Sequence, residues 1–98
     1  MIERIASEAH AETALRLAGL RPQPWSASPG TVFTPHQHDR AKRLYVVTGS
    51  INFRADATGD DVRLDPGEGI RIPARVEHTA VVGEDGVQCV EGFEEEPR

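Results

Sequence analysis

The sequence predicts an all-β fold, a small sandwich or barrel, and three observations support that class. From residue 31 onward, short apolar segments alternate with turns rich in glycine and proline, a spacing typical of antiparallel strands. Helix-forming composition occurs only within residues 1–20, so the sequence offers no helices to connect the strands of a parallel sheet. The length of 98 residues corresponds to a single domain.

Composition narrows the function classes. The net charge of −5 and the lack of a basic stripe argue against nucleic-acid binding, because phosphates need clustered cations. Apolar runs are too short to span a membrane, and no secretory signal is recognisable. A single cysteine, Cys89, excludes an internal disulfide and fits a reducing compartment. We therefore expect a soluble cytoplasmic protein that binds neither nucleic acid nor membrane.

Residues 1–30 are predicted to form a helix and a proline-rich arm that covers the barrel or docks on a partner subunit. The helix is expected within residues 1–20, with Ser7 as a cap and Gly19 as its end. Residues 2–5 alternate in polarity, so an edge strand is the alternative there. His10 is expected to be a solvated surface residue.

Residues 21–30 contain three prolines, a density that predicts no regular element. Trp25 lies in the middle of this segment. Its indole is expected either to cover a hydrophobic patch of the core or to form a lid or wall of a ligand site.

Residues 31–93 are predicted to form the barrel, as part of one domain that spans residues 1–98. Gly49-Ser50 and the segment 83–86 are read as turns, and the tail from Glu94 is expected to fray. The expected strands are 32–34, 42–48, 51–55, 62–64, 69–72, 77–82 and 87–93.

Three histidines form a candidate metal site. His36 and His38 stand two residues apart, so in an extended strand both imidazoles point to the same face. His78 follows a proline-centred turn about forty residues later. Three neutral imidazoles suit a divalent transition ion such as Zn, Ni, Fe, Mn or Cu, and they leave positions open for water or substrate. The alternative is that they are ordinary surface or barrel histidines.

The spacing around these histidines resembles the cupin superfamily. That family's first motif reads Gly, five residues, His-x-His, three or four residues, Glu, six residues, Gly. Gly30, His36, His38 and Gly49 stand at the matching places, and Lys42 stands where the family has Glu.

The second cupin motif reads Gly, five residues, Pro-x-Gly, two residues, His, three residues, Asn. Gly67, Pro73 and His78 match it, whereas Arg75 and Val82 stand at its second Gly and its Asn. The resemblance covers residues 30–82. It implies a small double-stranded β-helix or jelly-roll barrel of the single-domain cupin 2 conserved barrel type, commonly a homodimer, with a metal in its mouth. It does not select one activity.

Lys42 is the residue that departs from the family pattern. Strand alternation places Lys42, Leu44 and Val46 on one face, so its ammonium is expected to point into the cavity. There it can bind an anionic group of a ligand, such as a carboxylate or phosphate, or form a salt bridge with an acid in the barrel. The remaining alternative is that it turns to solvent at the rim.

Glu91 is a candidate fourth metal ligand or partner of Lys42. If residues 83–86 close a two-residue hairpin, His78 pairs with Glu91 and Ala80 with Cys89, and cross-strand partners share a face. The alternative makes Glu91 the start of the acidic tail and Cys89 a small core residue.

The sequence therefore predicts a metal-binding small cupin and leaves its activity open. One hypothesis is a metal-dependent enzyme, an oxygenase, isomerase or decarboxylase, acting on a small anionic organic molecule with Lys42 as a catalytic group. The other is a non-catalytic module that binds metal or a small ligand in a degenerate site. A small-molecule ligand and a homodimer are the expected partners.

Overall fold

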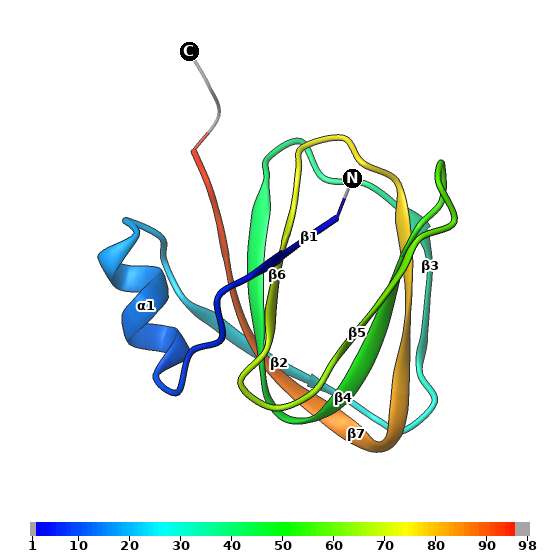
Figure 1. Ribbon diagram of the computed structural model, residues 1–98, viewed down its shortest axis with the longest axis horizontal. Coiled ribbons are helices and arrows are strands. Elements are labelled where there is room, and N and C mark those ends of the chain that lie inside the picture. Colours follow the sequence, from blue (N-terminus) through cyan, green and yellow to red (C-terminus); the bar gives the residue numbers. More distant parts are fainter. Residues whose placement is uncertain (1, 96–98) are drawn as a thin grey trace.

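The computed structural model describes residues 2–95, and it confirms the all-β class with a short helix. Two antiparallel layers of strands face each other, and the helix lies outside one of them (Figure 1). The elements are β1 (Glu3–Ile5), α1 (Ala11–Leu17), β2 (Gln23–Ala27), β3 (Val32–His36), β4 (Lys42–Ala55), β5 (Asp61–Leu64), β6 (Gly69–Ile72) and β7 (His78–Phe93).

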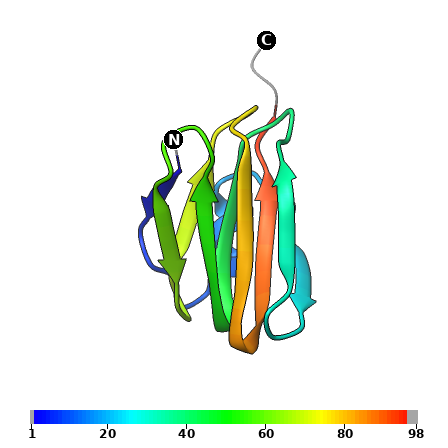
Figure 2. The same cartoon turned by 90° about the vertical axis from the view of Figure 1, so that its right-hand side faces the viewer.

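The two long strands, β4 and β7, belong to both layers. They pair with each other along their length, and each bends midway. The first layer has the order β1-β6-β4-β7-β2. In the second layer, β5 pairs with the C-terminal half of β4 and β3 pairs with the N-terminal half of β7, as the side view shows (Figure 2). This arrangement is a small jelly-roll barrel.

The bends lie at glycines, and they correct two predicted turns. Gly49 and Gly86 both have positive φ, and a Cβ at Gly49 would lie 1.9 Å from the carbonyl oxygen of Gly86. The predicted hairpin at 83–86 is wrong, because β7 continues through it and both of its halves pair with β4. Gly49-Ser50 is likewise a bulge within β4. Glycine and polar residues mark a bulge and a hairpin in the same way, so sequence alone did not separate them.

The N-terminal segment contains the helix predicted within residues 1–20, but the helix is short and a strand precedes it. Residues Glu3–Ile5 pair with β6, which satisfies their backbone hydrogen bonds and favours the strand alternative. The helix begins after His10, and no side chain caps it, so Ser7 does not have the predicted role. Gly19, with a φ of +82°, follows the helix end as predicted.

The proline-rich segment is also more regular than predicted. Residues 23–27 form β2, which pairs with β7 at the edge of the first layer. An edge strand has one side without ladder hydrogen bonds, so Pro24 is tolerated despite its missing N–H. The expectation of no regular element in residues 21–30 is therefore wrong.

The core lies between the two layers. Lys42, Leu44 and Val46 are all buried, as the predicted alternation required. The enclosed apolar cluster consists of Ile2, Leu44, Val46, Ile51, Phe53, Ala55, Leu64, Ile70, Ile72, Ala80, Val82, Val87 and Cys89.

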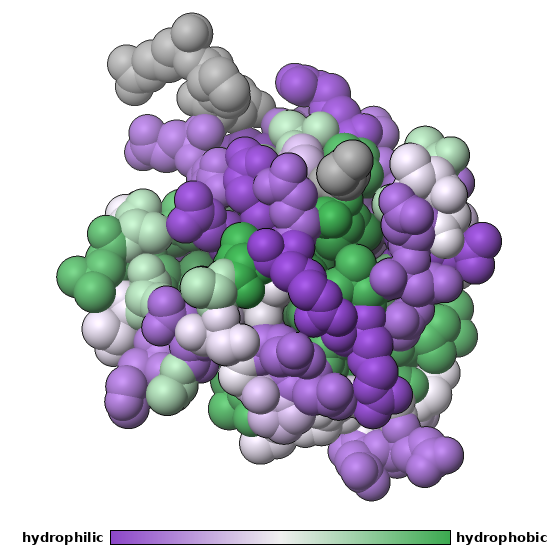
Figure 3. Space-filling model, viewed as in Figure 1, coloured by the Kyte–Doolittle hydropathy of each residue, from purple (hydrophilic) through white to green (hydrophobic). Residues whose placement is uncertain are grey.

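A second apolar cluster lies outside the first layer, beneath α1. It joins Leu15 of the helix to Tyr45 of β4 and Val90 of β7. Leu17, on the far side of the helix, is 84% exposed. In the view of Figure 3, hydrophilic side chains form a band through the middle of the molecule, and apolar side chains show on both sides of it, over α1 among other places. Within the described residues, no helix is long and apolar enough to cross a membrane.

The start of the C-terminal tail is anchored. Arg43 and Arg71 are direct cross-strand partners, and Glu94 accepts hydrogen bonds from both guanidinium groups, at 3.0 Å from Arg43 and 2.8 Å from Arg71. Glu94 also donates its backbone N–H to the carbonyl oxygen of Ala41. Like charges directly opposite one another destabilise a sheet, and the carboxylate of Glu94 offsets part of this repulsion by bridging the two guanidinium groups. The expected fraying therefore does not apply to Glu94. Residues 96–98 of the tail lie outside the described part of the chain.

Candidate metal centre

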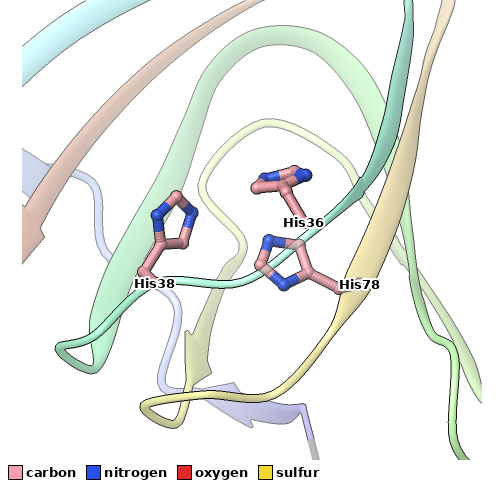
Figure 4. Close-up of side chains that lie close together, drawn as sticks. All are labelled: His36, His38 and His78. Atoms are coloured by element: carbon pink, nitrogen blue, oxygen red, sulfur yellow. The ribbon is translucent and has the colours of Figure 1, made fainter.

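The three histidines converge at one end of the barrel, which we call the mouth. His36 is the last residue of β3, His78 is the first residue of β7, and the two are register partners. His38 follows β3 by two residues. All three imidazoles face a common space (Figure 4). Strand pairing therefore explains how residues about forty positions apart meet.

The ring positions are compatible with one shared ion. The ring centroids of His36 and His78 lie 4.3 Å apart, those of His36 and His38 lie 5.0 Å apart, and those of His38 and His78 lie 5.4 Å apart. One nitrogen from each ring lies within 4.8 Å of the others. Ligand nitrogens bind a transition ion at about 2.0–2.1 Å, so this cluster is close to the size that one ion requires.

Backbone contacts orient two of the rings. Nδ1 of His36 lies 2.7 Å from the carbonyl oxygen of Thr34, and Nδ1 of His78 lies 2.8 Å from that of Val76. A carbonyl only accepts, so each Nδ1 is the protonated nitrogen and each Nε2 keeps its lone pair. Metal-binding histidines commonly donate their second N–H in this way.

Two of the ring nitrogens are buried without a partner in the described residues. They are Nε2 of His38 and Nε2 of His78. An unsatisfied buried polar atom costs about 1–3 kcal/mol, so native proteins rarely keep one without a use. A metal ion shared by the cluster would satisfy both, and the donor set therefore fits a divalent transition ion.

The electrostatics of the mouth keep these rings neutral, which is the form that binds metal. Burial is the main cause that lowers the pKa of His38 from 6.5 to about 4, and the ammonium of Lys42 lowers it further. Burial also lowers the pKa of His78. Both imidazoles are therefore uncharged near neutral pH.

A strained loop supports His38. Arg75 has a φ of +62°, a conformation that favours glycine, and its backbone N–H donates to the carbonyl oxygen of His38 over 2.7 Å. This is the position at which the second motif carries glycine. The loop between β6 and β7 thus holds the segment that bears His38.

Behind the histidines lies a cavity of about 380 Å³. Phe33, Phe53 and Trp25 form apolar walls, while Lys42 and Glu91 contribute the charges. Nζ of Lys42 lies 3.3 Å from Oε1 of Glu91, and both side chains are almost buried. Of the alternatives open for Lys42, the structure therefore shows a salt bridge with an acid in the barrel.

Glu91 faces the cavity, although the predicted hairpin is wrong. It lies on the inner face of β7 because it follows Val87 and Cys89 at intervals of two residues along the strand. Its Oε1 contacts Lys42 and Trp25, and the three-histidine group does not include it. The role of Glu91 as a fourth ligand remains a prediction. Burial raises the pKa of the Cys89 thiol to about 12, so Cys89 is an inert core residue.

Trp25 is the site residue whose role the sequence left least defined. Its Nε1 donates to Oε1 of Glu91 over 2.7 Å, and its ring packs edge-on against Phe33. It lines the cavity and also packs against the core cluster, so the structure supports both roles that the sequence left open. Only the pairing of β2 with β7 brings Trp25 opposite Cys89, and a segment with three prolines gave no sign of that strand.

Comparison with known proteins identifies the family. The model of the cupin domain family matches residues 25–90. The chain belongs to the cupin family. That match spans both histidine segments and most of the strands described above. No curated protein matches this cupin significantly.

Solved structures share the fold at low sequence identity. A chain from the crystal structures of the DMSP lyases RdDddP and RnDddQII has a TM-score of 0.70 and 24% identity, over 81% of this cupin and 43% of that chain. The polyketide cyclase RemF from Streptomyces resistomycificus has a TM-score of 0.67 and 26% identity, over 81% of this cupin and 57% of that chain. KdgF from Halomonas sp. has a TM-score of 0.62 and 24% identity, over 97% of this cupin and 82% of that chain. This cupin thus spans only about half the length of the first two proteins.

Proposed function

We propose that this protein is a metal-binding cupin in which His36, His38 and His78 hold one divalent transition ion. The observation that carries the proposal is the pair of buried Nε2 atoms, on His38 and His78, that have no partner among the described residues. The third ring, His36, has its Nδ1 engaged by a backbone carbonyl and its other nitrogen within reach of the same point. Nitrogen donors suit Zn, Ni, Cu, Fe and Mn, and availability and geometry would decide among them.

We further propose that the metal serves chemistry on a small organic molecule. The cavity of about 380 Å³ lies at the small end of the range for ligand sites, and His36 and His38 line it together with apolar walls. Three protein ligands leave positions open, and a bound ion would supply a Lewis acid there. Lys42 would orient or protonate the ligand, and Glu91 lines the same cavity as a second acid–base group. An oxygenase, an isomerase and related activities all remain compatible with this site.

A second candidate function is a non-catalytic module that binds metal or a small ligand. The ion pair between Lys42 and Glu91 favours it, because each charged group of the cavity already has a partner. Turnover would separate the two candidates, whereas metal binding is common to both.

Metal analysis of the untagged protein tests the shared part of the proposal. Wild type is expected to bind about one equivalent of a divalent transition ion, while His36→Ala and His78→Ala lose most of it. His10→Ala is the matched control, since His10 is exposed and lies outside the cluster. Equal, near-zero metal content in all four proteins after loading would refute the proposal.

A further inference from the structure

The cavity contains a charged group that the histidine site does not use. Lys42 is 6% exposed, and its ammonium lines the cavity together with His36 and His38. A buried ion pair is weak evidence for stability, because desolvation of both charges offsets their attraction. Two apolar residues of similar volume often give equal or higher stability at such a position, so we look for a functional role of Lys42 and Glu91.

The contacts of Glu91 are unequal. Nε1 of Trp25 donates to Oε1 over 2.7 Å, which is a short and well-formed hydrogen bond. Nζ of Lys42 lies 3.3 Å from the same oxygen, longer than the 2.7–2.9 Å of a strong charge-assisted bond. In residues 2–95, Glu91 is the only ion-pair or hydrogen-bond partner that the structure gives Nζ, which also lies 5.9 Å from the centre of the Phe93 ring. Glu91 is therefore held by Trp25, while the ammonium is only loosely engaged and keeps donors for another partner.

The charge around the cavity suits an anion. A divalent ion among the three imidazoles would add two positive charges beside Lys42, and the cluster contains no carboxylate to offset them. A neighbouring outer pocket carries one charge of each sign, Arg40 and Asp39, and the Arg40 guanidinium lies 5.2 Å from the centre of the Phe93 ring. His38 and Phe93 line this outer pocket, and His38 lines the inner cavity as well.

We propose that Lys42 is the docking group for the carboxylate of a small organic acid, which takes the place of Glu91 as the partner of the ammonium. This inference rests on the proposed function, because the rest of the ligand would extend toward the histidines. A carboxylate is favoured over a phosphate because the ammonium is a single point charge that already accommodates the carboxylate of Glu91. A phosphate dianion commonly takes several donors, and Lys42 is the one cationic side chain that lines the cavity within residues 2–95.

Succinate binding, measured by calorimetry on metal-free and metal-loaded protein, tests the proposal, with uncharged succinamide as the control ligand. Lys42→Met is expected to weaken succinate binding at least about tenfold, because it removes the charge and keeps much of the length. Glu91→Gln is expected to strengthen it about tenfold, because the amide oxygen still accepts from Trp25 but, without a charge, competes less strongly for the ammonium. Succinamide is expected to bind weakly to every variant.

Thermal unfolding of the same variants separates docking from a purely structural role. A structural ion pair predicts that both substitutions lower the melting temperature and leave succinate affinity unchanged. Docking predicts that Glu91→Gln lowers the melting temperature yet raises affinity. The double variant Lys42→Met/Glu91→Gln, which leaves no unpaired charge, keeps the test valid if Lys42→Met alone does not fold.

The outcomes distinguish this inference from the proposed function. Metal binding with no effect of Lys42→Met on succinate affinity overturns the inference alone. Succinate binding that depends on Lys42 in a protein that takes up no metal overturns the metal site alone and supports docking. Failure of succinate to bind wild type and Glu91→Gln also overturns the inference. Tighter, Lys42-dependent binding of inorganic phosphate would overturn the choice of a carboxylate.

Discussion

The two ends of the barrel are built on different principles. At the closed end, β4 and β7 bend through Gly49 and Gly86, and backbone packs directly against backbone. At the mouth, the contacts come from side chains: the histidine cluster, the ion pair of Lys42, and Glu94 between two arginines. The closed end tolerates almost no added atom, while the mouth holds polar groups that a ligand can engage. Close backbone packing at the bends therefore fixes the shape of the barrel, while the polar side chains at the mouth supply the groups that can bind a ligand.

Gly49→Ala should lower stability the most, because it disrupts the close backbone packing at the closed end. The new Cβ would meet the Gly86 carbonyl at 1.9 Å in a backbone conformation that already disfavours alanine. We expect the free energy of unfolding to fall by more than about 3 kcal/mol. Urea denaturation followed by circular dichroism measures it.

Gly30→Ala is the matched control for that substitution. Gly30 has a similar φ of +73°, but a Cβ there meets no atom within 4 Å. A loss of only about 1 kcal/mol is expected, from backbone strain alone. Equal losses in the two variants would mean that the close approach at the bend is not what limits the closed end.

The pH dependence of stability probes the mouth, through Glu94. Hydrogen bonds from Arg71, and then from Arg43, lower the pKa of Glu94 below its usual 4.5. A carboxyl whose pKa is lower in the folded state stabilises fully above about pH 4.5, and that contribution disappears as the pH falls through the lowered value. Glu94→Gln should therefore cost about 1–2 kcal/mol at neutral pH.

The difference between wild type and Glu94→Gln should vanish in acid. Urea denaturation of both proteins from about pH 7 down to about pH 3 measures it. A difference that stays constant across this range would show that the charge of Glu94 does not hold this side of the mouth together.

Arg75→Gly should have the smallest effect, and its sign should be the opposite. Glycine relieves the strain at a φ of +62°, while its greater freedom in the unfolded chain offsets part of the gain. We expect stability to rise by about 0.5–1 kcal/mol. Glu77→Gly, a nearby exposed position without a positive φ, should instead lose stability. Equal losses from both would contradict the strain assigned to this loop.

The all-β class and the buried face of β4 could be predicted from the sequence because they depend on local patterns of residues. Alternation along residues 42–46 predicted which side chains enter the core, and the spacing of His36 and His38 predicted that their rings share a face. The resemblance to the cupin motifs implied that His78 joins them. The reading failed where tertiary pairing overrides local signals. Three prolines concealed β2, and a glycine-rich segment in β7 was read as a hairpin although it is a bend.

Glu91 shows both sides of this limit. Its inward direction followed from alternation and was correct, but the pairing used to derive it was not. The contact between Trp25 and Glu91 joins residues 66 positions apart through an edge strand. No local pattern encodes such a contact, and for that reason the hydrogen-bonded partner of the cavity acid emerged only from the structure.

The sharing of β4 and β7 between both layers has a consequence for motion. Neither layer has a complete set of strands of its own, so one layer does not separate from the other without breaking the longest ladder in the molecule. Native-state hydrogen exchange should therefore find the central amides of both layers opening together, in one cooperative unit. Openings of smaller amplitude would be confined to the peripheral strands β1, β2 and β5, so the cavity wall that Trp25 of β2 forms would open more readily than the walls on β4 and β7.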